Sequence, residues 1–146
     1  MPGQLVSGAL TRMSAGSLRD AEHMATLLSR GFGVKEYIEG GLTGSSSSLT
    51  TMWTVTLKGT GELRLVLATA SPTVNSKGIN CSDISEIRFG KASQAQDLNF
   101  PIRQSMVSII GSETVLTVLF DDEALRSKFV KRMQCFLLNT KIKTGR

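Results

Sequence analysis

The segment DDEALRSKFVKRMQCFLL, residues 121–138, decides the fold class of this sequence. It opens with two aspartates, and a carboxylate there caps the first turn of a helix and suits its positive dipole end. Large apolar residues then recur at steps of three and four, which places them on one helix face: Leu125, Phe129, Met133 and Phe136. The segment therefore predicts an amphipathic helix over 122–138 whose apolar stripe covers another apolar surface.

The surface under that stripe is predicted by residues 33–120, in which apolar and polar residues alternate. Turn signals divide this region into about seven short strands, including hairpins at 52–68 and 106–120. A Gly/Ser/Thr stretch over 40–48 and a polar stretch over 91–103 are predicted as loops. An antiparallel sheet with one apolar face is expected to curl into a partly open barrel, and the last helix is expected to plug its end.

The remaining segments complete one predicted domain over 15–140. A helix is expected over 17–30 with Ser17 as its cap. Residues 1–14 are predicted as a flexible leader and residues 141–146 as a basic tail. The fold class is therefore mainly β with α: a seven-stranded antiparallel, partly open barrel that a C-terminal helix caps, with an extra N-terminal helix.

Composition excludes several classes of protein. The 146 residues suit one domain, and no apolar run approaches the roughly 20 residues that span a bilayer. The first residues show no signal-peptide pattern, so a cytoplasmic location is expected. Association with a membrane periphery or with the cytoskeleton is compatible with this location. Cys81 and Cys135 are predicted as free thiols rather than a disulfide. No enzyme activity, metal or cofactor is expected, because His23 is the single histidine and no catalytic motif accompanies it.

Three segments resemble one branch of a known family: Leu27–Gly31, Trp53–Leu57 and Asp83–Lys91. Through them, residues 24–138 resemble the N-terminal pleckstrin-homology (PH) domain of phosphoinositide-specific phospholipase C enzymes, with Phe129 where that family usually has tryptophan. The resemblance implies a PH-like fold and a phosphoinositide headgroup site at the open end of the barrel. Such a site needs several Lys and Arg side chains that converge on phosphates.

The cations for such a site are sparse in this sequence. Lys35 matches a first-strand lysine of the family, and Lys77 is the one basic residue of the loop after the third strand. The family's second-strand arginine has no counterpart, and residues 39–49 contain no basic side chain. Lys35 and Lys77 are therefore predicted as a weak anion or phosphoinositide site, and ordinary solvated lysines are the alternative.

A second set of cations lies on the closing helix: Arg126, Lys128, Lys131 and Arg132. In a chain of net charge +5, this basic patch is a candidate surface for an anionic membrane or a partner. The alternative is a solvated helix face. Nucleic-acid binding is not expected, because aromatic residues are only 5% of the chain and do not interleave with the basic ones.

These features favour a non-catalytic PH-like binding module. It would mediate protein interaction or scaffolding, or recruit its parent protein to a membrane or cytoskeletal site. The alternative is a phosphoinositide-binding membrane-targeting domain, in one version the regulatory N-terminal part of a phospholipase C-like enzyme. A protein partner is expected, an anionic phospholipid is the alternative ligand, and the sequence leaves the oligomeric state open.

Overall fold

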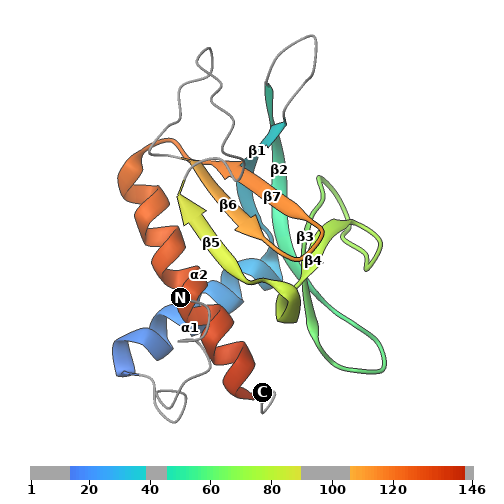
Figure 1. The fold of residues 1–146 in the computed structure, drawn as a ribbon, viewed down its shortest axis with the longest axis vertical. Helices are drawn as coiled ribbons and strands as arrows, with labels where there is room; N and C mark the ends of the chain where they lie inside the picture. The colour runs from blue at the N-terminus through green and yellow to red at the C-terminus, as the bar shows by residue number, and fades with distance from the viewer. Residues whose placement is uncertain (1–13, 39–45, 90–105, 144–146) are drawn as a thin grey trace.

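The computed structural model describes residues 14–38, 46–89 and 106–143 (Figure 1). Its elements, in chain order, are α1 (Ala15–Arg30), β1 (Phe32–Ile38), β2 (Ser46–Thr56), β3 (Leu63–Leu67), β4 (Lys77–Asn80), the 3-10 turn η4 (Cys81–Asp83), β5 (Glu86–Phe89), β6 (Met106–Ile110), β7 (Val115–Leu119) and α2 (Glu123–Lys143). The loop predicted over 91–103 and most of the predicted leader lie outside the described residues, as does the end of the predicted tail.

The strands of the described ranges form one antiparallel sheet of seven, in the order β4-β3-β2-β1-β7-β6-β5. β1 lies in the middle and pairs with β2 along its whole length, but it pairs with β7 only at Lys35↔Leu119 and Glu36↔Val118. In these ranges the outer strands β4 and β5 do not pair with each other, so the barrel is partly open. The predicted fold class is confirmed: a mainly β, PH-like, antiparallel sheet with an N-terminal and a C-terminal helix.

The two helices cross each other and cover the sheet (Figure 1). α2 contributes Phe129, Met133 and Phe136 to the core, and each of these side chains is at most 3% exposed. α1 adds Met24 and Leu28 to the same core. Burial of these large apolar side chains is the main force that holds the helices on the sheet, at about 1.5–3 kcal/mol for each side chain.

The apolar stripe of α2 is rotated from its predicted position. Leu125, predicted within the stripe, is 46% exposed, whereas Arg126 is only 7% exposed. Successive helical residues are about 100° apart, so Arg126 lies about 20° from Met133 around the helix and Leu125 about 80° from it. Met133 is fully buried at the centre of the packed face. The helix therefore buries Arg126 and leaves Leu125 at the edge of the interface.

α1 begins earlier than predicted and ends where predicted. Ser14, not Ser17, is its cap: the Ser14 hydroxyl accepts a hydrogen bond from the Ser17 backbone N–H at 3.0 Å. The helix ends at Gly31, whose φ of 93° lies in the region that favours glycine. A Cβ on Gly31 would lie 2.8 Å from the Trp53 ring, so this close approach also requires glycine.

Two further predicted boundaries are wrong. The predicted 40–48 loop is too long, because Ser46–Ser48 belong to β2 and pair with Glu36–Ile38 of β1. Strand pairing satisfies the backbone there despite the polar composition. The last helix does not end at residue 138 but runs to Lys143, so the first three residues of the predicted basic tail, 141–143, are helical. Its later turns are held by a hydrogen bond from the Thr140 hydroxyl to the Phe136 carbonyl, 2.9 Å, and by packing on η4.

Candidate functional site

The two predicted ligand lysines, Lys35 and Lys77, are both paired with carboxylates. Lys35 Nζ lies 3.7 Å from Asp121 Oδ1, just beyond the end of β7. Lys77, at the start of β4, donates to Glu36 Oε2. Glu36 follows Lys35 on β1, and successive side chains of a strand point to opposite faces of the sheet. The structure therefore places the two lysines on opposite faces and does not bring them together.

The predicted basic patch of α2 is divided by the packing of the helix. Arg126 is enclosed, with its Nη2 atom 3.5 Å from Glu123 Oε2 and 3.3 Å from Ser127 Oγ. Because its guanidinium faces the protein, Arg126 is not available as a surface cation. The structure therefore contradicts its place in a patch that contacts a membrane or partner.

The other three cations of the patch lie outside the packed face. Lys131 Nζ and Arg132 Nε both approach Asp20 of α1, at 3.8 Å and 3.7 Å. Lys128 is exposed and forms no ion pair with any residue in the described part of the chain. Of the predicted patch, Lys128 is therefore the cation most available to a ligand.

An open groove lies between α1, β1 and the first half of α2. We call it the α1–β1–α2 groove; it has a volume of about 580 Å³. Its mainly apolar walls come from both helices and from the middle of the sheet. They include Leu27, Phe32, Gly33, Leu49, Phe120 and Leu125.

The groove exists because β1 and β7 separate. Their pairing stops at Lys35↔Leu119, and the chain leaves β7 through Phe120 to begin α2. Phe129 of α2 fills the base of this wedge, with its ring centroid 5.9 Å from that of Phe32 and 4.8 Å from that of Phe120. The three aromatic rings thus pack together where the two strands separate, and all three line the groove.

Gly33 contributes no side chain to the groove, and the space beside it is open. A Cβ on Gly33 would meet no heavy atom within 4 Å, and its φ does not lie in the glycine-favouring region. Leu49, the register partner of Lys35 on β2, is 74% exposed at the groove, and Leu125 is 46% exposed on the opposite wall. Exposed apolar side chains beside an open cavity are typical of a surface that binds a partner or ligand.

The rim of the groove carries charge of both signs. Lys35 and Asp121 form their ion pair on one side, and Lys128 and Arg132 of α2 lie on the rim further along the helix. The start of α2 is acidic, and the Asp122 carboxylate accepts a hydrogen bond from the Leu125 backbone N–H at 2.8 Å. Asp122 is thus the helix cap, one of the two aspartates predicted for this role.

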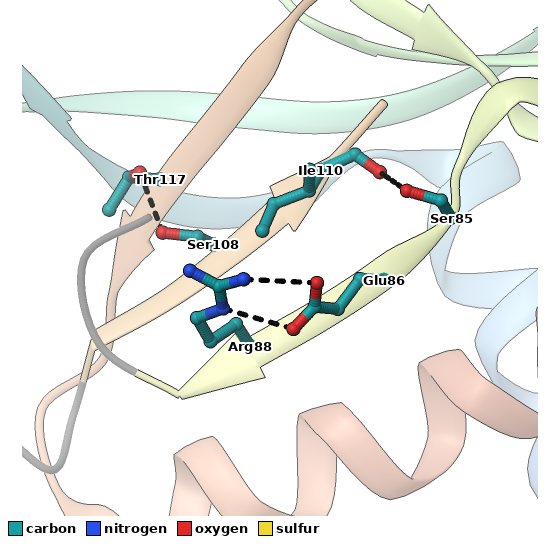
Figure 2. Close-up of polar contacts among 6 residues, drawn as sticks. All are labelled: Ser85, Glu86, Arg88, Ser108, Ile110 and Thr117. Carbon is teal, nitrogen blue, oxygen red and sulfur yellow. Dashed lines mark hydrogen bonds and ion pairs between the residues drawn. The ribbon is translucent and has the colours of Figure 1, made fainter. Parts of the chain in front are cut away.

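The segment with the strongest family resemblance has a structural role. On β5, the Arg88 guanidinium donates to both carboxylate oxygens of Glu86, at 2.9 Å and 3.1 Å (Figure 2). These hydrogen bonds from Arg88 lower the pKa of the Glu86 carboxyl. Ser108 on β6 and Thr117 on β7 share a hydroxyl hydrogen bond of 2.9 Å nearby (Figure 2). The Ser108–Thr117 hydrogen bond links β6 to β7, and the Glu86–Arg88 ion pair within β5 leaves these two charges compensated.

Both cysteines are free thiols, as predicted. Burial raises the pKa of the Cys81 thiol to about 12, and the charge of Lys141 opposes this only in part. A thiol with such a pKa stays neutral at physiological pH, and nucleophilic attack requires the thiolate. Cys81 is therefore a packing group. His23 is exposed on α1, and the described residues contain no cluster of three potential metal ligands.

The fold defines the class of this chain as a helix-capped, PH-like β domain. Searches for relatives find no family model that matches the sequence and no curated protein that is similar to it. The phospholipase C resemblance thus remains a prediction. No helix of the described ranges has both the length and the apolar character to cross a membrane.

The groove was missed by sequence reasoning. Gly33 and Phe120 lie 87 positions apart in the chain, and only the separation of β1 from β7 brings them to one cavity. One local signal was present: Leu49 is an isolated large apolar residue after a run of serines. A strand in contact only with water would not be stabilised by an apolar side chain at this position.

Proposed function

We propose that this chain is a non-catalytic binding module whose α1–β1–α2 groove docks a segment of a partner protein. The observation that carries the proposal is the open apolar groove above Gly33, flanked by two exposed leucines. Its volume of about 580 Å³ falls in the range of about 300–1,000 Å³ typical of ligand sites. Burial of Leu49 and Leu125 by a partner would remove apolar surface from water, which is the usual source of binding free energy.

Phosphoinositide binding, the alternative function, has weaker support. A headgroup site needs several cations that converge on its phosphates. Lys35 and Lys77 instead point to opposite faces of the sheet, and each is next to a carboxylate. On this proposal, the module reaches a membrane or cytoskeletal site through its protein partner, and the phospholipase C resemblance concerns its fold.

The test is affinity capture from a lysate of the source cells with a groove-filling variant. Gly33→Trp places a large side chain in the open space of the groove, at a strand position that accepts aromatic residues. The matched control is Gly16→Trp, since a Cβ on Gly16 of α1 also meets nothing within 4 Å. Both variants must first show the wild-type circular-dichroism spectrum.

We expect proteins that the wild type and Gly16→Trp both recover and that Gly33→Trp loses. If every captured protein is retained by Gly33→Trp, or if nothing specific is captured, the groove is not the binding site and the proposal is wrong.

A further inference from the structure

The flank of α2 that borders the groove carries one apolar and two basic side chains. Leu125, Lys128 and Arg132 all line the groove. With about 100° between successive residues, the three positions lie within about 60° of one another around the helix. A chain lying along the groove would therefore meet an apolar contact first and a basic region about one to two helical turns later.

The basic region is the incompletely neutralised end of the groove. Lys128 is exposed and has no ion-pair partner in the described ranges, while Arg132 lies 3.7 Å from Asp20. At the other end, Lys35 and Asp121 compensate each other at 3.7 Å. A ligand that enters the groove thus gains most from a negative charge placed near Lys128.

The geometry also distinguishes a peptide chain from a membrane. The surface of a bilayer is flat on this scale and cannot enter the space between α1, β1 and α2. A single extended chain can enter that space and contact Lys128 on its wall.

We infer that the occupant is a short acidic and apolar segment of a partner protein. This inference rests on the proposed function and deepens it. Large apolar side chains of the segment pack above Gly33 and between Leu49 and Leu125, and an Asp or Glu side chain pairs with Lys128. The distance along α2 from residue 123 to residue 132 is about 14 Å, which an extended segment of about four residues spans.

The test is selection of a random peptide library displayed on phage, with the full chain as bait. Enriched peptides are then synthesised, and their Kd values are measured by fluorescence polarisation for the wild type and three variants. Lys128→Glu reverses the proposed contact and Gly33→Trp fills the groove. Lys58→Glu makes the same charge change in the exposed turn after β2 and is the matched control.

We expect enriched peptides that contain large apolar residues and at least one Asp or Glu. Lys128→Glu should weaken their binding at least tenfold, Gly33→Trp should abolish it, and Lys58→Glu should leave it within twofold. Replacement of the critical acidic residue of the peptide by lysine should restore binding to Lys128→Glu.

The other outcomes separate the two proposals. Peptides that require an open Gly33 but lack acidic residues, or that tolerate Lys128→Glu, overturn this inference and leave the groove as a docking site. Peptides that bind Gly33→Trp as well as the wild type overturn both. Phosphatidylserine vesicles that bind the wild type and lose binding to both Gly33→Trp and Lys128→Glu would identify a membrane as the occupant and also overturn this inference.

Discussion

Replacement of Phe129 by alanine should destabilise the domain strongly. The side chain is 3% exposed, belongs to the core, and stacks on Phe32 at 5.9 Å and Phe120 at 4.8 Å. Phe→Ala in a packed core costs about 3–5 kcal/mol, and two aromatic partners favour the upper part of that range. Since small domains have about 5–15 kcal/mol of stability, Phe129→Ala should lose about a quarter or more of the total.

Leu125→Ala is the matched comparison on the same helix. Leu125 is 46% exposed, so its truncation should cost about 1 kcal/mol, half of what a buried leucine contributes. Urea denaturation followed by circular dichroism at 222 nm (the helix band) measures both values, with unchanged slopes as the sign that both variants unfold as the wild type does. Equal losses, or a larger loss for Leu125→Ala, would refute the conclusion that α2 buries Phe129 and leaves Leu125 at the edge of the interface.

Three further predictions concern other parts of the chain. Gly31→Ala should lower the free energy of unfolding in urea by about 2–4 kcal/mol, because φ is 93° and the added Cβ would collide with Thr51 and Trp53 of β2. Gly33→Ala should change that free energy by less than about 1 kcal/mol, and similar losses for the two variants would contradict this prediction. The folded pKa of Cys81, about 12, exceeds its ordinary value of 9.0, so its stabilising effect is complete below pH 9.0 and decreases as pH rises towards 12. The stability advantage of the wild type over Cys81→Ala should shrink by about 1.4 kcal/mol between pH 8 and pH 10, and a constant difference would contradict the burial of this thiol. Binding to vesicles should not depend on their phosphoinositide content, and Lys35→Ala with Lys77→Ala should leave it unchanged in co-sedimentation; a selective loss would restore the headgroup site.

The architecture was predictable from the sequence because each element carries a local pattern. Alternating apolar residues mark the strands, and the three- and four-residue steps to Phe129, Met133 and Phe136 mark the last helix. The rotation of the last helix about its axis, which decides the side chains that face the core, was predicted less well. Arg126 was predicted to lie off the apolar stripe in a basic patch, yet a long side chain can bury its stem while its guanidinium keeps polar contacts. Glu123 and Ser127 provide such contacts in the structure.

The candidate site was less predictable because it depends on contacts between distant segments. Lys35 and Lys77 were predicted as the cations of one weak anion site, but nothing local predicts Asp121 and Glu36 as their partners. Strand pairing and the position of α2 decide those pairs. Ser46–Ser48 show the same limit, since their polar composition predicts a loop and pairing with β1 makes them a strand.

Hydrogen exchange of the complex with a captured partner tests the central claim most directly. The method reports backbone amides that become protected on binding. We expect protection on β1 at residues 32–35 and at the start of α2, with little change on β4, which contributes no residue to the groove lining. Protection confined to β4 or to the β5–β6–β7 surface, with the β1 amides unchanged, would contradict the claim.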